Sequence, residues 1–459
     1  MTETFKNHPN NSVTRMKIFV HVIIVCLFLF SQALFLINIQ YPKGHNFDES
    51  GYVPAAAQLL LMTGNRNWEH PPLAKLLMAL GIKLFGDQPL GWRYMSTFFG
   101  SLTLVGMYLW ALALFRDQRT ALFAALITVV NQLLYVQARI GTLDIFLFAF
   151  TVLALAAFCA AWSIKADRHK VFLLLLSAGV MFGLAIACKW AAVAPWLSAI
   201  LMIITVKAMQ NWHTVFQGDS PWKSRHREFE DWYSPSLFGG IGMKRLVIAL
   251  VIVPVFVYFL TFLPLLFLHK FDYVLYSTLD LFSMQLKMWN QQSNICGSHP
   301  YMSTWTSWPL MIRPIWYAFE KEGNDSYRCV VMLGNPLIMW GGLLALLYCT
   351  WAWIARRSRE AFLILGFYCV FYLGWAVIPR KITYYYYYYP AGMTLSMAIA
   401  FLFHYWGSGK TSWLARIQML RWVFLAACIL IFIYFYPVLA DLKITLETYH
   451  QRMWFRSWI

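Results

Sequence analysis

Residues 41–80 read YPKGHNFDESGYVPAAAQLLLMTGNRNWEHPPLAKLLMAL and follow an apolar run over 18–39. That run is long enough to cross a bilayer, which takes about 20 apolar residues. Two adjacent carboxylates, Asp48 and Glu49, therefore stand where the chain leaves its first membrane span. The chain is poor in acidic residues, with 20 Asp and Glu against 37 Lys and Arg, so an acidic pair at a membrane surface indicates a functional site.

Composition places the chain among polytopic membrane proteins. Its 459 residues are 60% hydrophobic and 12% charged, with a mean hydropathy of +0.55. Soluble domains contain about 25% charged residues. The run over 18–39 is too long for the apolar core of a signal peptide and lacks a small-residue cleavage site, so we expect it to be retained as a span.

Eleven apolar segments predict an all-α protein with about eleven membrane spans. They cover residues 18–39, 94–115, 120–137, 145–163, 171–188, 191–207, 246–268, 331–354, 361–378, 390–406 and 419–437. If the spans alternate in direction, most Lys and Arg residues of the connecting loops fall on one side, which is then cytoplasmic and carries the N-terminus. This bias explains the net charge of +17 without a nucleic-acid partner.

The whole chain, 1–459, is expected to form a single transmembrane domain with two longer loops on the extracytoplasmic side. The first loop, 40–93, carries the acidic motif and an amphipathic helix at the membrane surface, and the second covers 269–330. Cys296 and Cys329 both fall in the second loop. A disulfide between them is expected only if that loop faces an oxidising compartment.

Polar residues that converge on the extracytoplasmic side form the candidate site. They are Asp48, Glu49, Glu69, His70, Arg139, Asp144, Lys189, His299, Trp308 and Arg380. A carboxylate beside an apolar slab has its pKa raised toward values useful for a general base, and such a base contributes roughly 10²–10⁴-fold to a rate. Asp48 has an alternative role as the N-cap of the following helix, with Glu49 in its first turn.

Several other candidates also have two interpretations. Arg139 and Asp144 either pair with each other, or Arg139 meets an anion while Asp144 orients another group. Lys189 either extends to the membrane interface or meets a phosphate. The run Tyr384–Tyr389 is interpreted mainly as an interfacial aromatic belt.

The second loop and the missing nucleotide motifs bear on the substrate. Residues 299–317 read HPYMSTWTSWPLMIRPIWY, which suits an interfacial helix or a platform that stacks on sugars. Basic residues without a nucleotide-binding motif, and without an Asp-x-Asp diphosphate clamp, favour a monophosphate presented by a lipid. Glu69, His70 and His299 are ligand types that suit a divalent metal, although their spacing does not require one.

The motifs of these loops resemble the protein O-mannosyltransferases, the polyprenyl-phosphate-mannose-dependent members of the GT-C class of glycosyltransferases. The resemblance runs from about residue 40 to 390 and rests on Asp48-Glu49, Glu69-His70-Pro71-Pro72-Leu73-Ala74-Lys75, Arg139 with Asp144, Lys189-Trp190, His299-Pro300-Tyr301, Trp308-Pro309, Arg313-Pro314-Ile315-Trp316-Tyr317 and Gly334-Asn335-Pro336. The motifs of the two long loops, in this order, are the specific part of the match.

The resemblance implies a GT-C membrane fold with an extracytoplasmic site that transfers mannose, with inversion, from a β-linked lipid phosphate to Ser or Thr hydroxyls of proteins. It implies these roles: Asp48 as the base, Glu49 as its support or a contact of the peptide backbone, Arg139, Lys189 and Arg380 at the donor phosphate, and His299 and Trp308 over the sugar. Glu69, His70 and Asp144 are the remaining candidates for substrate contacts.

Two departures from the family pattern concern the acceptor. The loop 269–330 is too short for the lumenal β-trefoil domains of eukaryotic members, which indicates a bacterial member in the inner membrane. A tyrosine run replaces the family's His-containing segment before the tenth span. A lipid or glycan acceptor, as in the aminoarabinose transferases of lipid A, is therefore the alternative. A transporter of lipid-linked sugars ranks lower because the charges gather on one face rather than at mid-bilayer.

Overall fold

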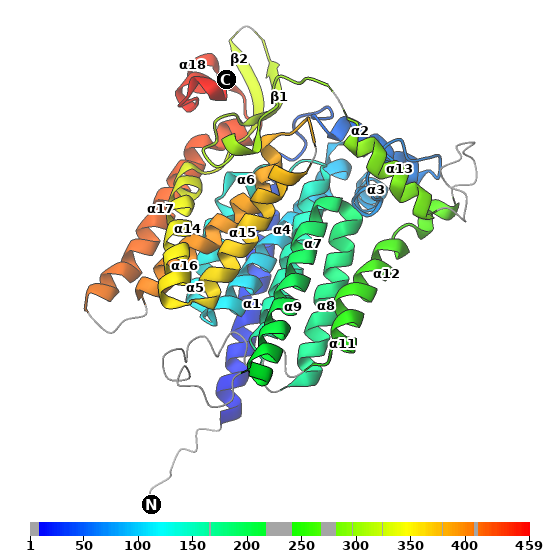
Figure 1. Ribbon diagram of the computed structural model, residues 1–459. Helices are drawn as coiled ribbons and strands as arrows, with labels where there is room; N and C mark the ends of the chain where they lie inside the picture. The colour runs from blue at the N-terminus through cyan, green and yellow to red at the C-terminus, as the bar shows by residue number, and fades with distance from the viewer. Residues whose placement is uncertain are drawn as a thin grey trace, which may run out of the picture.

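The computed structural model describes residues 9–164, 167–216, 241–267, 281–295, 297–323, 325–378, 380–407 and 412–459. Long helices lie side by side and form one bundle (Figure 1). Within the described residues, eight helical segments are long and apolar enough to cross a membrane. The prediction of a helical membrane protein is therefore confirmed, although the structure also contains a small sheet.

The eight segments match eight of the predicted spans. They are α1 (Pro9–Leu36), α4 (Pro89–Phe115), α7 (Leu143–Trp162), α8 (Arg168–Cys188), the continuous α11 (Met243–Val247), η4 (Ile248–Ile252) and α12 (Val253–Leu260), α14 (Pro336–Arg356), α15 (Arg359–Val377) and α17 (Ser412–Leu439). The apolar part of α7 is 78% buried and that of α1 only 22%, so α7 lies in the centre of the bundle and α1 at its margin.

Three further predicted spans correspond to helices that are shorter or less apolar. They are α5 (Gln118–Val129) with α6 (Gln132–Gln137), α9 (Val193–Phe216) and α16 (Tyr389–Gly407). All of them lie within the same bundle (Figure 1). The count of eleven spans stays a prediction.

The chain makes two tight turns between closely spaced helices. The chain turns between α6 and α7 over 138–142, and α7 begins at Leu143. It turns again where α8 ends at Cys188, because Lys189 has an extended backbone with φ −163° and ψ 138° and a single 3-10 turn follows. These two turns carry Asp144 and Lys189 to one end of the bundle.

The first loop forms two helices at that end (Figure 1). α2 (Glu49–Leu60) and α3 (Leu73–Phe85) pack against each other, and α3 also packs on α4. Pro72 precedes α3, where a missing N–H has no cost because the first turn of a helix leaves its N–H groups unpaired. The predicted surface helix is thus a helical pair.

The second loop contains a helix and a small sheet rather than an irregular chain. α13 (Leu281–Ser293) lies beside the first loop, and β1 (Ile315–Lys321) pairs antiparallel with β2 (Ser326–Met332). A short strand near the C-terminus, β3 (Ile444–Thr445), adds to the far side of β2. α18 (Leu446–Arg452) follows and lies against the sheet (Figure 1).

Candidate active site at one end of the bundle

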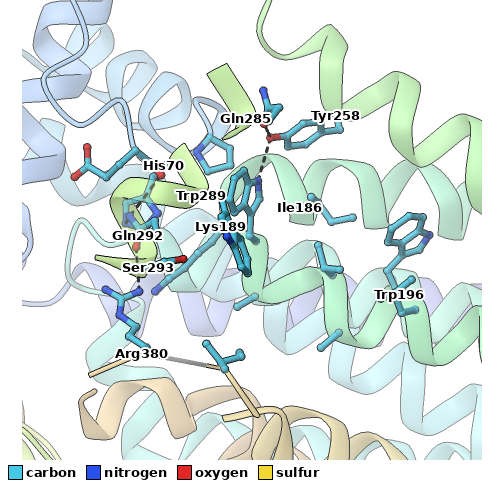
Figure 2. Close-up of a pocket in the computed structure, with 18 of the residues that line it drawn as sticks. His70, Ile186, Lys189, Trp196, Tyr258, Gln285, Trp289, Gln292, Ser293 and Arg380 are labelled. Carbon is cyan, nitrogen blue, oxygen red and sulfur yellow. Dashed lines mark hydrogen bonds between the residues drawn. The ribbon is translucent and has the colours of Figure 1, made fainter. Parts of the chain in front are cut away.

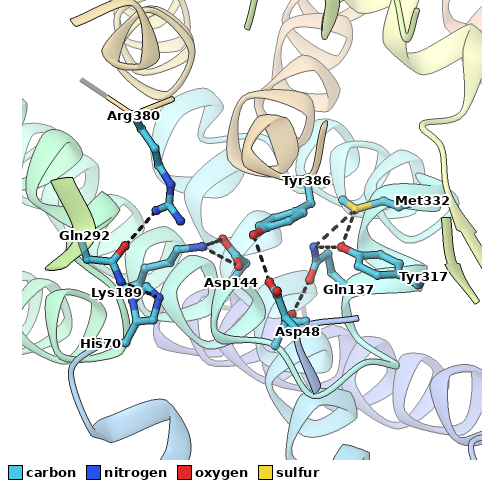
Figure 3. Close-up of polar contacts among 11 residues, drawn as sticks. Asp48, His70, Gln137, Asp144, Lys189, Gln292, Tyr317, Met332, Arg380 and Tyr386 are labelled. Atoms are coloured by element: carbon cyan, nitrogen blue, oxygen red, sulfur yellow. Dashed lines mark hydrogen bonds and ion pairs between the residues drawn. The ribbon is translucent and has the colours of Figure 1, made fainter. Parts of the chain in front are cut away.

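Asp48 is half-buried immediately before α2. Its Oδ2 accepts a hydrogen bond of 3.0 Å from the hydroxyl of Tyr386 (Figure 3). The carboxylate makes no hydrogen bond to the N–H groups of α2. Helix capping therefore does not explain where this side chain lies, and the alternative role considered for Asp48 is not supported.

The surroundings of Asp48 make it a stronger base than an ordinary aspartate. Burial raises its pKa to about 6, and Lys189, the hydrogen bond from Tyr386 and the charge of Arg380 oppose that rise. The ordinary value is about 3.9. At neutral pH the group is still mostly ionised, so it combines raised basicity with availability.

Lys189 and Asp144 form a buried ion pair next to this carboxylate. Nζ of Lys189 lies 2.9 Å from each carboxylate oxygen of Asp144. The same Nζ lies 5.2 Å from the ring centroid of Tyr386 and 4.9 Å from that of Tyr387. Asp144 thus pairs with Lys189 and not with Arg139, and Tyr386 connects the pair to Asp48.

A second group of polar side chains completes the cluster. Nη1 of Arg380 donates to Oε1 of Gln292 at 3.2 Å, and Nε2 of Gln292 lies 3.2 Å from Nε2 of His70 (Figure 3). Burial lowers the pKa of His70 well below its usual value, and nearby cations add to the effect. The ring is therefore neutral at physiological pH. Gln292 comes from α13, so the second loop closes this side of the site.

A cavity of about 650 Å³ continues from the polar cluster between α8, α9 and α12 (Figure 2). Lys189, His70, Gln292 and Arg380 lie together on one side of the view. The rest of the wall is mostly apolar and includes Ile186, Trp190, Trp196, Leu197, Pro254, Val255, Phe259 and Trp289. Such a cavity fits an extended apolar molecule with an anionic group at its polar end.

Glu49 has a different environment from its neighbour. It is fully buried, and its two oxygens accept hydrogen bonds of 2.8 and 2.9 Å from Arg93. The N–H groups of Asn46 and Gly141 also donate to it, at 2.9 and 2.8 Å. These contacts occupy the carboxylate, so the structure favours a structural role for Glu49 over contact with a substrate.

Arg139 also serves the framework. It is 6% exposed, and its guanidinium donates to the main-chain carbonyls of Phe35, Ile37 and Asn38 at the end of α1. The group also lies 4.9 Å from the ring of Tyr135. These contacts favour fixation of α1 over the predicted contact with a phosphate.

The remaining predicted residues are divided between the site and the core. Glu69 lies on the cavity wall beside His70 and accepts a hydrogen bond of 2.7 Å from Asn67. The ring of His299 lies 5.3 Å from that of Phe47, the residue before Asp48. Trp308 is fully buried and donates to Ser303, so its face is not available to stack on a sugar.

The interpretation of the tyrosine run as an interfacial belt is wrong for five of its six residues. Tyr385–Tyr389 are each exposed by 4% or less. The ring of Tyr387 stacks on Trp375 with centroids 4.3 Å apart, and Tyr386 holds Asp48. The belt pattern and an interior aromatic cluster look alike in sequence, because both are apolar rings with one polar atom.

Sequence reasoning missed several residues of the site. They are Tyr386, Gln292, Gln137, Tyr317 and Tyr52, whose ring lies 5.8 Å from that of His70. Gln292 lies in a segment with alternating polar and apolar residues and carries no motif. Gln137 donates to the hydroxyl of Tyr317 at 3.2 Å and accepts from Thr142, a network that only the tertiary structure brings beside Asp48.

Two predictions concern metal and disulfide chemistry. In the part of the chain that the structure describes, no three His, Cys, Asp or Glu side chains gather where they could hold a metal ion. Cys329 is buried with a free thiol. Its predicted partner, Cys296, lies outside the described residues.

Known proteins are similar to this chain in sequence and in fold. Two family models match, the C-terminal four-transmembrane region of protein O-mannosyltransferase over residues 277–458 and dolichyl-phosphate-mannose-protein mannosyltransferase over residues 69–217. The polyprenol-phosphate-mannose–protein mannosyltransferase of Corynebacterium glutamicum is 26% identical, with alignment over 90% of this chain and 88% of that protein.

Two solved structures have a similar fold. One is the Saccharomyces cerevisiae protein O-mannosyltransferase Pmt1–Pmt2 complex bound to the sugar donor, with a TM-score of 0.76, 16% identity, and coverage of 96% of this chain and 92% of that chain. The other is ArnT from Cupriavidus metallidurans bound to undecaprenyl phosphate, with a TM-score of 0.55, 14% identity, and coverage of 90% and 64%.

These similarities identify the protein as a membrane glycosyltransferase with the GT-C fold. Within that class, the two family models together with a relative aligned over nine-tenths of the chain define the family. This chain belongs to the protein O-mannosyltransferases.

Proposed function

We propose that this protein transfers mannose from a polyprenyl-phosphate carrier to Ser and Thr hydroxyls of proteins. The observation that carries the proposal is the cavity of mixed character. Its apolar wall suits the polyprenyl chain, and its polar end, with Lys189 and Arg380, lies beside the basic carboxylate of Asp48. The Corynebacterium glutamicum relative is named for the same kind of donor, polyprenol-phosphate mannose, and for a protein acceptor.

The donor lies with its lipid chain between α8, α9 and α12 and its phosphate at Lys189 and Arg380. Asp144 already neutralises much of the charge of Lys189, because both carboxylate oxygens are 2.9 Å from Nζ. Arg380 contacts only a glutamine, a main-chain carbonyl and an aromatic ring among the contacts found in the described residues. Arg380 therefore supplies most of the positive charge that is free to meet a phosphate.

The transfer is a single displacement at the anomeric carbon. Asp48 takes the proton of the Ser or Thr hydroxyl. At the same time, the hydroxyl oxygen of the acceptor bonds to the anomeric carbon from the face opposite the phosphate. The bond between that carbon and the phosphate oxygen breaks, and polyprenyl phosphate leaves with the electron pair. Lys189 and Arg380 stabilise the negative charge that develops on the leaving group, usually the largest electrostatic contribution to such a reaction.

Protonation states support this division of work. With a pKa of about 6, Asp48 is roughly 90% ionised at pH 7 and accepts a proton more readily than an ordinary aspartate. His70 is neutral because burial lowers its pKa. It therefore adds no positive charge beside the sugar and suits hydrogen bonding to a hydroxyl.

The active site faces the extracytoplasmic side of the bacterial inner membrane in this proposal, and the N-terminus lies in the cytoplasm. The excess of Lys and Arg in the loops at the other end of the bundle supports that orientation, because such loops stay in the cytoplasm. Labelling of single cysteines in intact cells with a membrane-impermeant reagent tests it. A Cys at the tip of the β1–β2 hairpin should react, and one between α14 and α15 should not.

The decisive experiment is transfer by the purified protein in lipid. Synthetic polyprenyl-phosphate mannose and a Ser-containing peptide are the substrates, with and without a chelator. We expect an α-linked mannosyl peptide from a β-linked donor. Asp48→Asn should form this product roughly 10²–10⁴-fold more slowly, although that variant still binds donor. Near-normal turnover by the variant contradicts the role of Asp48, and mannose found only on a lipid contradicts the protein acceptor.

A further inference from the structure

The small sheet next to the active site has one occupied edge and one open edge. Its strand order is β1-β2-β3, so β2 lies in the middle. β3, an extended Ile444–Thr445 segment of the same chain, covers the far edge of β2. No strand among the described residues pairs with the outer edge of β1, which faces the side of the molecule where α2 and α13 lie (Figure 1).

The pairing pattern identifies the main-chain groups on the open edge. The N–H of Glu322 donates to the carbonyl of Ser326, which makes this pair hydrogen-bonded. Hydrogen-bonded and non-hydrogen-bonded pairs alternate along antiparallel strands. The N–H and carbonyl of Phe319 and Lys321 therefore point away from β2.

The opposite strand gives the same alternation. Tyr327 is the partner of Lys321 in β2, and its own outward groups face β3, where it pairs with Ile444. Open main-chain groups on an edge strand are a template for an added strand. Phe319, Glu320 and Lys321 are all exposed, Phe319 by 44%, so this template is accessible.

The two faces of β1 have different neighbours. Phe319 and Trp316 contact Tyr449 of α18, with ring centroids 5.3 and 5.6 Å apart. Tyr317 lies on the other face, and its ring is 5.8 Å from that of Phe47, the residue before Asp48. The register shift between Trp316 and Ala318 re-aims Tyr317 in this way. β1 therefore runs from the neighbourhood of Asp48, the proposed catalytic base, outward to the surface.

We propose that the open edge of β1 binds the polypeptide acceptor as an added strand and so delivers its Ser or Thr to Asp48. The inference rests on the proposed function and names how its acceptor is recognised. The ligand is an extended segment of polypeptide, bound mainly through its main chain, and a lipid acceptor has no such groups to offer.

The position of the edge argues for this occupant. A strand rises about 3.3 Å per residue, so Lys321 lies about 13 Å along the strand from Tyr317. A segment paired over that length needs only about four residues on one side of its hydroxyl residue. Main-chain pairing supplies affinity without a fixed sequence, and alternate side chains point toward the catalytic side.

The test measures binding of fluorescent peptides to the full-length protein in lipid nanodiscs, without donor. One peptide has about eight residues on each side of a single Ser, and each of its main-chain N–H groups is N-methylated in turn. We expect sensitivity with a period of two residues on one side of the Ser, each sensitive position raising Kd about tenfold, the factor that corresponds to about 1.4 kcal/mol for one hydrogen bond.

Variants of Lys321 connect this pattern to β1. The N–H of Lys321 points outward and makes no hydrogen bond within the sheet. Lys321→Pro replaces it with a ring that keeps an added strand away from this edge, so the variant should abolish the alternation near the outer end of the peptide. Lys321→Ala keeps the N–H and should preserve the alternation. A wild-type protein with no period of two, or a Lys321→Pro variant with an unchanged pattern, overturns the proposal.

The remaining outcomes separate the inference from the proposed function. If the effect of N-methylation on Kd alternates but no mannose is transferred to the bound peptide, the result supports peptide binding at the edge of β1 and contradicts the proposed reaction. If mannose is transferred to peptides whose binding shows no such alternation, the proposed reaction stands and peptide binding at the edge of β1 is overturned. A change of oligomeric state in Lys321→Pro, with no effect on peptide binding, assigns the edge to a second copy of the chain and also overturns it.

Discussion

Asp48 and Glu49 are neighbours in sequence, yet their surroundings differ in every respect that matters for chemistry. Glu49 is fully buried and accepts four hydrogen bonds, two of them from Arg93. Asp48 is half-buried, accepts a single hydrogen bond from Tyr386, and lies beside the polar cluster at the end of the cavity. A fully satisfied carboxylate stabilises the fold, whereas one with an unused oxygen is available to take a proton.

Replacement of the available carboxylate has the largest expected effect. Asp48→Asn keeps the size of the side chain and the contact with Tyr386 but removes the base. We expect kcat to fall by roughly 10²–10⁴-fold, with donor binding and melting temperature almost unchanged. Activity with radiolabelled donor and a thermal-shift assay provide the two measurements. A large loss of stability would show that Asp48 resembles its neighbour.

Replacement of the satisfied carboxylate should have the opposite profile. Glu49→Ala leaves the buried charge of Arg93 without its carboxylate partner, with only main-chain carbonyls as acceptors, and such a loss costs about 3–5 kcal/mol. We expect poor recovery of folded protein and a strongly lowered melting temperature. The double variant Glu49→Leu with Arg93→Met removes both charges and should recover part of the loss. Normal stability of the single variant would contradict a structural role for the pair.

The cations of the cavity should affect the donor more than the acceptor. Arg380→Gln removes a charge that forms no direct ion pair with a carboxylate among the described residues, so we expect KM for the lipid donor to rise about 10- to 100-fold with a smaller change for the peptide. Lys189→Met also leaves Asp144 unpaired and should lower stability in addition. Equal effects on both substrates would contradict a phosphate site at Arg380.

The smallest expected effect concerns Tyr386 and is visible in the pH dependence. The hydrogen bond from Tyr386 lowers the pKa of Asp48, so Tyr386→Phe should raise that pKa above about 6. The base must be ionised, and activity falls as pH falls through its pKa. The acidic limb of the kcat/KM profile should therefore move to higher pH, with a two- to fivefold loss near pH 7 and little loss at pH 8.5. An acidic limb at the same pH as in the wild type would show that Tyr386 does not influence the pKa of the base.

The mutual positions of the candidates were less predictable than their identities. The sequence showed that Asp48, Lys189 and Arg380 lie at one end of the bundle, because span counting assigns each loop to a side. It did not show that Lys189 pairs with Asp144 or that Arg139 binds the end of α1, because helix rotation and tilt follow from packing across the whole bundle. Trp308 illustrates the same limit, since a motif residue on a loop proved to be core.

The order and composition of the residues were enough to predict the membrane class, the approximate positions of most spans and the place of the acidic pair. These properties depend on local composition and on the length of apolar runs, which a bilayer selects directly. Which carboxylate is free to act could be seen only in the folded chain, since the partner of Asp48 lies 338 positions away in the sequence and that of Glu49 lies 44 positions away. The pKa of a side chain depends on its neighbours in space, and packing brings those neighbours together.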